Sequence, residues 1–205
     1  MKYGTFVEVS GELRDQLEFV ARARAKHLLR PSLLHILIEP SEVDGGIYKA
    51  VASDGQRLHI VDPLSCGDDT GIEPGLWRFL KQDNKTLWMA KIEDTDILPF
   101  PNYRKVLPVD APLFSTTFSP KYKRSLSANN IAGFLRETIV FLARFPKPTA
   151  IDPKFLSDLT MLQWDVAWHG NQKYVVFEHR PYKTVIMPMA VYECDGEIVE
   201  GENNG

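Results

Sequence analysis

The sequence predicts an α+β fold made of two similar halves, each with helices packed on an antiparallel sheet. The first indication is Asp54-Gly55, a dipeptide that favours a hairpin turn because glycine accepts a positive φ. The second is helical spacing of apolar residues over 11–27. The third is that both halves run through a helix, hairpins, a second helix that opens at a proline, and further strands.

The predicted domains follow from that repeat. A length of 205 residues allows two small domains, and the proline-rich stretch after Ile97 breaks regular structure. We expect one domain over 5–103 and a second over 104–192. The remaining residues, 193–205, are predicted to form an acidic, disordered tail.

In the first half, Ser10 is a suitable N-cap for the helix of 11–27. Pro74 predicts a second helix running to Asp83-Asn84, because proline fits the first helical position. The strands of this half are predicted at 5–9, 33–39, 46–53, 57–62, 86–91 and 97–100.

In the second half, Asn129 or Asn130 is a suitable cap for a helix through Leu142, which is apolar on most sides and is therefore expected to be buried. Asp152-Pro153 predicts a short helix that ends near residue 161. Strands are predicted at 113–118, 164–168, 174–179 and 184–189.

Composition excludes two classes of protein. Hydrophobic residues at 44% and aromatic residues at 11% exclude disorder over most of the chain. No run approaches the roughly 20 consecutive apolar residues of a membrane-spanning helix. Residues 1–12 lack the apolar core of a signal peptide, so we expect a cytoplasmic protein.

The charge is unevenly distributed. The net charge is −3, but the tail from residue 193 carries five acids and no base, which leaves a net charge of +2 on residues 1–192. Segments 22–30 and 121–147 are locally basic. Such segments suit contact with a polyanion, although solvated basic surfaces are common.

No catalytic or metal-binding pattern is present in the sequence. The five histidines are scattered, and Cys66 and Cys194 lie too far apart in sequence to suggest a shared site. Asp94 and Asp96 are close enough to share a cation, but a solvated loop is the better interpretation. We expect no enzyme activity, no metal and no cofactor. An enzyme with an unrecognised site stays an alternative.

Three short segments carry a resemblance to a family. They read Val-Ala-Ser-Asp-Gly-Gln-Arg-Leu at 51–58, Phe-Pro-Asn-Tyr-Arg-Lys-Val-Leu-Pro at 100–108, and Val-Ile-Met-Pro-Met at 185–189. Together they resemble the bacterial DNA sliding clamp, the beta subunit of DNA polymerase III. That family has Ala-Thr-Asp-Gly-His-Arg-Leu, Phe-Pro-Asp-Tyr-Arg-Arg-Val-Leu-Pro and Met-Pro-Met in the same order. The resemblance implies a DNA-clamp-like fold that matches only the middle and C-terminal domains of the family, the latter shortened.

The resemblance also implies a partner peptide-binding cleft between the two domains. Its residues are mostly apolar, and methionine adapts to more than one ligand. Arg57 is expected to orient a peptide carbonyl or carboxylate. Carried over by motif, the cleft comprises Leu33, Ser53, Gly55, Gln56, Arg57, Leu58, Pro101, Lys105, Val106, Val185, Met187, Pro188 and Met189.

The function implied is that of a processivity factor for DNA replication, which encircles duplex DNA without reading its sequence. The DNA-facing candidates are Arg22, Arg24 and Lys26 on the first predicted helix, with Arg78 and Lys81 on the second. Two domains per chain require a homo-oligomer of three chains for a six-domain ring. The alternative is a clamp-derived adaptor or decoy that binds DNA polymerase or other clamp clients without encircling DNA.

Overall fold

The computed structural model describes residues 2–26, 31–93, 99–120, 128–147, 149–159, 162–170 and 174–189. Its helices are α1 (Gly11–Ala21), α2 (Ala128–Leu142) and α3 (Pro153–Leu156), with short 3₁₀ turns η1 (Pro31–Leu34), η2 (Asp68–Thr70) and η3 (Tyr103–Val106). The strands of the first half are β1 (Tyr3–Ser10), β2 (Ile36–Pro40), β3 (Tyr48–Ser53), β4 (Arg57–Val61), β5 (Gly75–Gln82) and β6 (Thr86–Ile92). Those of the second half are β7 (Phe114–Phe118), β8 (Trp164–Trp168), β9 (Val175–His179) and β10 (Tyr182–Ile186). The predicted tail lies outside the described residues.

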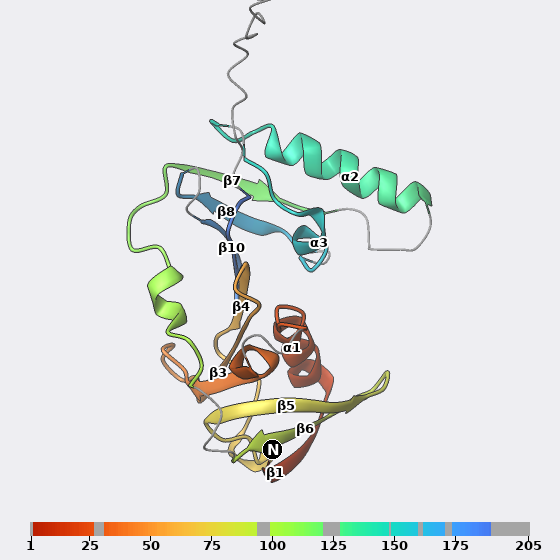
Figure 1. The fold of residues 1–205 in the computed structure, drawn as a ribbon, viewed down its shortest axis with the longest axis vertical. Helices are drawn as coiled ribbons and strands as arrows, with labels where there is room; N and C mark the ends of the chain where they lie inside the picture. Colours follow the sequence, from red (N-terminus) through yellow and green to blue (C-terminus); the bar gives the residue numbers. More distant parts are fainter. Residues whose placement is uncertain are drawn as a thin grey trace, which may run out of the picture.

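All ten strands form one antiparallel sheet in the order β1-β6-β5-β2-β3-β4-β10-β9-β8-β7 (Figure 1). The two halves meet where β4 pairs with β10, from Arg57 opposite Ile186 to Val61 opposite Tyr182. Because the pairing is continuous, the backbone groups that face each other at this joint satisfy one another. The predicted α+β architecture is confirmed in this sheet and the helices that pack on it.

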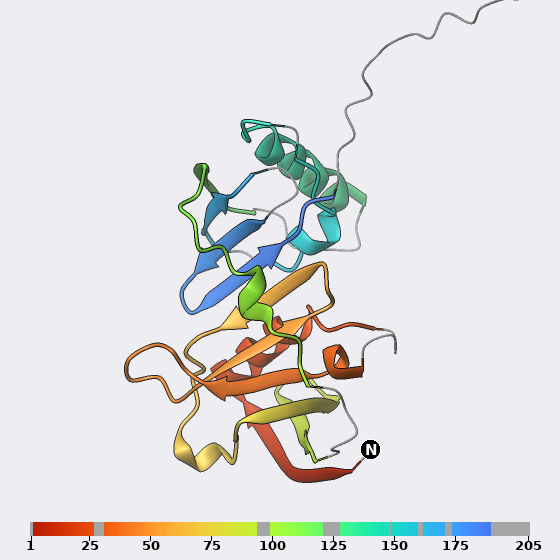
Figure 2. The ribbon, with the colours of Figure 1, turned by 60° about the vertical axis from the view of Figure 1, so that its left-hand side comes forward.

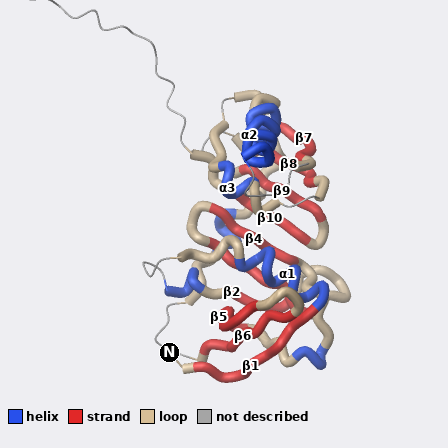
Figure 3. Tube along the Cα trace, turned by 90° about the vertical axis from the view of Figure 1, so that its right-hand side faces the viewer, coloured by secondary structure: helices blue, strands red, loops and turns tan. Residues whose placement is uncertain are grey.

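The two faces of the sheet have different covers. One apolar core contains buried residues of both α1 and α2, so these helices lie on the same face (Figure 3). A second, smaller core on the other face joins Leu58, Ile60 and Val185 to Tyr103. Tyr103 belongs to the linker that connects the halves, which crosses the sheet beside the β4–β10 junction (Figure 2). Alternation along β4 produces this division, because successive side chains point to opposite faces.

A buried ion pair fastens the halves on the helix face. Arg57, at the start of β4, donates from Nη1 to a carboxylate oxygen of Asp158, which follows α3. Its Nη2 donates to the Arg22 carbonyl at 2.6 Å, and its Nε lies 3.1 Å from Asp54 Oδ2. Both Arg57 and Asp158 are less than one-tenth exposed. A paired, hydrogen-bonded arrangement is what allows these charges to be buried.

The second helix predicted in the first half is wrong, because residues 75–82 form strand β5. Trp77 is buried and Arg78 exposed, the alternation of a strand. Asp83, expected near the end of that helix, instead makes a hairpin turn to β6: its Oδ1 accepts the N–H groups of Lys85 and Thr86, each at 2.8 Å.

Three other expectations are corrected. Helix α1 ends at Ala21 rather than 27, because the chain turns and Ala25 donates to the Leu33 carbonyl at 2.9 Å. Residues 99–100 are not a strand, and 97–98 lie outside the described residues. Helix α2 is not buried all round. Its outer surface exposes Ile131, Leu135, Ile139 and Val140.

Removing one partner of the buried pair is expected to destabilise the chain strongly. Asp158→Ala leaves the Arg57 guanidinium buried without its carboxylate, so the free energy of unfolding in urea should fall by about 3 kcal/mol. The exposed Asp165→Ala is the matched control and should change it by less than about 0.5 kcal/mol. The double variant Arg57→Met with Asp158→Leu should lose less than Asp158→Ala alone. A loss below about 1 kcal/mol for Asp158→Ala would contradict this role.

Stability is also expected to fall in mild acid. Burial, with the nearby Arg57 and Arg22 charges, lowers the pKa of His59 to about 3, although a hydrogen bond to Phe19 opposes this. Burial, with Arg78 and Arg24, lowers the pKa of His35 to about 4. Both histidines therefore take up protons more readily in the unfolded chain than in the folded one. Their contribution to the free energy of unfolding is complete above about pH 6.5 and declines below it. Between pH 7.5 and 5.0 each should remove about 2 kcal/mol of unfolding free energy. His35→Gln should reduce the difference between the two urea titrations; equal stability of the parent chain at both pH values would contradict the prediction.

Candidate functional site

A cavity of about 150 Å³ lies on the linker side of the sheet, where the β3–β4 hairpin, the linker and the end of β10 meet. It is bounded by side chains from four separate segments of the chain. They are Leu33, Ser53, Gly55, Gln56, Arg57, Leu58, Phe100, Pro101, Asn102, Tyr103, Val106, Val185 and Met187. The three segments that carried the family resemblance are thus brought together around one concave site.

Most of the predicted cleft residues line this cavity, and three do not. Lys105 is exposed on the outer side of η3. Pro188 and Met189 lie past the rim, because the Met189 N–H donates to the Ala150 carbonyl at 2.8 Å and carries the chain away. Phe100, Asn102 and Tyr103 line the cavity and were not predicted, although they stand in the same motif as Pro101.

The β3–β4 hairpin is held in shape by local turn chemistry. Gly55 has a φ of +91°, which its lack of a Cβ permits. Asp54 Oδ1 accepts the N–H groups of Gln56 and Arg57, each at 3.0 Å. The Met187 N–H donates to the Gln56 carbonyl at 2.9 Å, so the end of β10 is fixed to the hairpin. Two walls of the cavity are therefore set by the backbone.

The third wall is the linker, and Tyr103 anchors it. The Tyr103 ring is buried in the second core, and its hydroxyl hydrogen-bonds a carboxylate oxygen of Glu39. Burial and this hydrogen bond raise the pKa of Tyr103 to about 12, so the hydroxyl keeps its proton and donates. Arg104 Nη2 reaches the same Glu39 oxygen at 2.8 Å, and Asn102 Oδ1 accepts the Arg104 N–H at 3.2 Å. The anchored linker presents Pro101 and Val106 to the cavity.

The cavity offers apolar contact rather than an available charge. Leu33, Leu58 and Val185 are buried in its wall, and Met187 is exposed at its rim. Arg57 also contributes, but its guanidinium is held by Asp54, Asp158 and the Arg22 carbonyl. The expectation that Arg57 orients a peptide carbonyl or carboxylate stays a prediction, and these three contacts would compete with it. Such a site favours an apolar side chain that loses water on binding.

The predicted DNA-facing residues are divided between two faces of the sheet. Arg22 and Arg24 lie just after the last residue of α1. Arg22 Nη1 donates to the Asp158 carbonyl at 3.1 Å, and the guanidinium carbon of Arg24 lies 4.4 Å from the centroid of the Phe79 ring. Lys26 is exposed beyond them. Arg78 and Lys81 are on β5, not on a second helix, and point away from α1. Burial and the nearby Arg78 charge both lower the pKa of Arg24, so these two arginines lie within electrostatic reach of each other.

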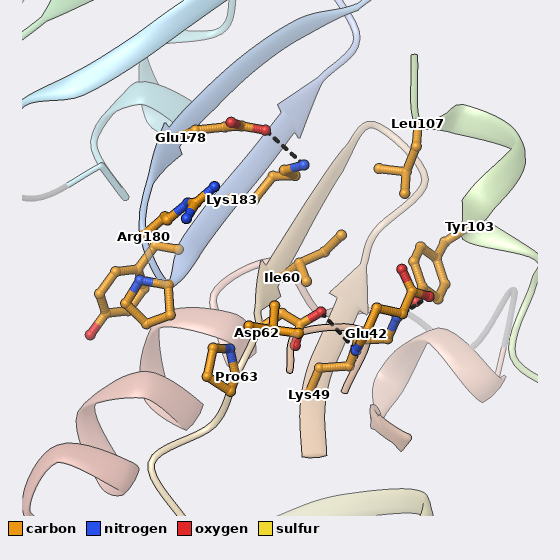
Figure 4. A pocket seen from close by; sticks show the side chains of 13 residues that line it. Glu42, Lys49, Ile60, Asp62, Pro63, Tyr103, Leu107, Glu178, Arg180 and Lys183 are labelled. Carbon is orange, nitrogen blue, oxygen red and sulfur yellow. Dashed lines mark hydrogen bonds and ion pairs between the residues drawn. The ribbon is translucent and has the colours of Figure 1, made fainter. Parts of the chain in front are cut away.

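A second cavity, of about 370 Å³, lies further along β4 and β10 on the same face (Figure 4). Ile60 forms its floor, and ion pairs stand at its sides, Lys183 with Glu178 at 2.7 Å and Lys49 with Glu42 at 2.5 Å. These charged side chains stand beside apolar ones, such as Pro63, Leu107 and Pro181, in the lining of this cavity. Among the described residues, no group of three or more His, Cys, Asp or Glu side chains is placed to hold a metal ion. No helix within the described residues is long and apolar enough to cross a membrane.

Comparison with known proteins identifies the fold. No protein-family model matches the sequence, and no curated protein matches it. Among solved structures, the DNA polymerase sliding clamp of Bacillus subtilis is similar, with a TM-score of 0.56 and 13% identity over 92% of this chain and 65% of that one. The Helicobacter pylori beta clamp bound to a DNA ligase peptide has a TM-score of 0.58 and 13% identity, over 93% of this chain and 66% of that one. Caulobacter crescentus pol III beta has a TM-score of 0.59 and 14% identity, over 92% of this chain and 66% of that one. The chain spans about two-thirds of these subunits, and over that length it has the fold of a bacterial DNA sliding clamp.

Proposed function

We propose that this chain is a sliding-clamp-like protein of DNA replication or repair whose cavity takes a short linear peptide from polymerases or other client proteins. One observation carries the proposal: an apolar cavity at the junction of the two halves, walled by the hairpin, the linker and the end of β10. The H. pylori clamp of similar fold was solved with a DNA ligase peptide bound. We propose 5–103 and 104–192 as the two domains on either side of this cavity.

The cavity chemistry supports a peptide ligand with an apolar anchor residue. The buried leucine and valine side chains of its wall favour an anchor that sheds water, while the exposed Met187 adapts its shape to the ligand. The linker wall is fixed through Tyr103 before any ligand arrives, so little ordering is needed on binding.

Met187 and Met189 provide a matched pair of variants for this site. Both are exposed, so neither truncation should unfold the chain, but only Met187 lines the cavity. In anisotropy titrations with a labelled DNA ligase peptide, Met187→Ala should weaken binding by about 1–3 kcal/mol. Met189→Ala should leave the affinity unchanged. Equal effects of the two variants, or none, would contradict the proposed binding site.

We propose further that three chains close a ring around duplex DNA. Within the described part of the chain, the sheet ends in two unpaired edges, β1 in the first half and β7 in the second. Such edges favour pairing with another chain, and repeated head-to-tail contacts close a ring when the rotation allows it. Above β7, α2 packs through Phe141 on Phe118, and its outer surface exposes Ile139. That apolar surface beside a free edge suits contact with the next copy.

Solution mass tests the ring. Light scattering coupled to size exclusion should give about 70 kDa, three times the chain mass of 23.3 kDa. Ile139→Glu, which puts a charge on the exposed surface of α2, should shift the mass toward 23.3 kDa, and Val109→Glu on the linker should not. The trimer should stay on closed circular DNA and leave once the circle is cut. A parent chain of 23.3 kDa that still binds the ligase peptide would instead favour the adaptor or decoy.

A further inference from the structure

The second cavity, of about 370 Å³, combines an apolar floor with charged sides (Figure 4). Ile60 is buried at the floor, and Pro63, Leu107 and Pro181 add apolar contact. The charged members of its lining are three acids and three bases, namely Glu42, Asp62, Glu178, Lys49, Arg180 and Lys183. A cavity of this size suits a small molecule, and its balanced charge suits a ligand that is itself neutral overall.

On the side of β3 and the linker, the charges neutralise one another. Lys49 Nζ lies 2.5 Å from a Glu42 carboxylate oxygen and 3.3 Å from one of Glu39. Arg104 Nη2 reaches the same two carboxylates, at 2.8 Å from Glu39 and 3.2 Å from Glu42. Two bases and two acids form this network, so it has no net charge to offer a ligand.

On the side of β9 and β10, Lys183 is paired with an acid and Arg180 is not. Lys183 Nζ lies 2.7 Å from Glu178 Oε1, and Asp165, opposite Glu178 on β8, is a further acid on that side. Within the described part of the chain, no acid forms an ion pair with the exposed Arg180. The guanidinium of Arg180 therefore has N–H donors for a ligand, although this side has no excess of positive charge.

Asp62 is the corresponding acid at the same end of the cavity. Its Oδ1 accepts from the Ser41 hydroxyl at 2.5 Å and its Oδ2 from the Glu42 N–H at 3.4 Å, and both donors are neutral. Among the described residues, no base forms an ion pair with Asp62. The Asp62 N–H donates to the Pro181 carbonyl at 3.0 Å, which holds this acid next to the turn of Arg180. One acid and one base without an ionic partner thus stand close together at the cavity.

We propose that the second cavity binds a free amino acid with a large apolar side chain, in its zwitterionic form. The ligand carboxylate accepts from the planar guanidinium of Arg180, and the ligand ammonium donates to Asp62. The ligand side chain packs on Ile60 and loses water there. A nucleic-acid strand does not suit the cavity, because three acids of the lining would repel its phosphates. A peptide segment does not supply both charges on one residue.

This site is independent of the proposed function. The linings of the two cavities have only Tyr103 in common. The lining of the second cavity includes no residue of β1, β7 or α2, the elements proposed for contact between copies. Failure of amino-acid binding is therefore distinguishable from failure of peptide binding or of ring formation.

The test is a titration of the isoleucine-methyl-labelled full chain with L-phenylalanine, followed by NMR. The Ile60 methyl should shift and saturate with a Kd on the order of 1 mM, as expected for so small a ligand. The methyl of Ile38, buried in the main core, should not move. N-acetyl-L-phenylalanine, which lacks the ammonium, and L-phenylalaninamide, which lacks the carboxylate, should each bind at least about tenfold more weakly.

Variants of the two charged residues assign each end of the ligand. Arg180→Gln should weaken L-phenylalanine at least about tenfold and should bind it and L-phenylalaninamide nearly alike, because the carboxylate has lost its partner. Asp62→Asn should in the same way bind L-phenylalanine and its N-acetyl derivative nearly alike. Arg144→Gln, an exposed arginine of the second half, is the matched control, and Met187→Ala tests the peptide cavity; both should keep the parent Kd.

Three results would overturn the proposal. The first is an Ile60 methyl that does not move at 10-fold the expected Kd. The second is equal binding of L-phenylalanine and both blocked derivatives, which would reduce the interaction to apolar contact. The third is an unchanged Kd for Arg180→Gln. This variant decides the matter even if Asp62→Asn disturbs the loop before β3, because Arg180 is exposed and makes no ion pair with a described residue.

Discussion

Five antiparallel residue pairs between β4 and β10 hold the architecture together, because they turn two smaller sheets into one of ten strands. Alternation along these strands sends Leu58, Ile60 and Val185 toward the linker and His59 toward α1. The buried Arg57–Asp158 pair locks the helix face of the junction. The peptide cavity lies at the end of the strand pairing, where the Met187 N–H reaches the Gln56 carbonyl. A change in this junction therefore alters both stability and the cavity.

The faces of the sheet are suited to different tasks. The helix face holds the main core and presents the end of α1 with Lys26, and the linker face holds the cavity. One antiparallel sheet supplies both because its strands alternate and because the linker packs on the strands at the junction. Under the proposed function, duplex DNA and client peptides would then occupy separate surfaces.

Local chemistry was predictable from the sequence, and long-range partners were not. The Asp54-Gly55 turn is encoded by adjacent residues, so the hairpin was predicted from them, whereas its part in the cavity was implied only by the family resemblance. Strand β5 was missed because Pro74 and Trp77 fit a helix locally, whereas pairing with β6 and β2 decides the structure. The Arg57–Asp158 pair joins residues 101 apart, and no spacing rule indicates it. Tyr103 stood in the quoted motif, but only its hydrogen bond to Glu39 shows that it anchors the wall.

The central claim is that the junction cavity binds a client peptide, and methionine methyl NMR tests it most directly. With five methionines in the chain, the spectrum is simple enough to follow each methyl group during titration with the DNA ligase peptide. The Met187 methyl, at the cavity rim, should shift and saturate with the peptide, while Met89, buried beneath α1, should not move. A peptide that binds while the Met187 signal stays in place would contradict the claim.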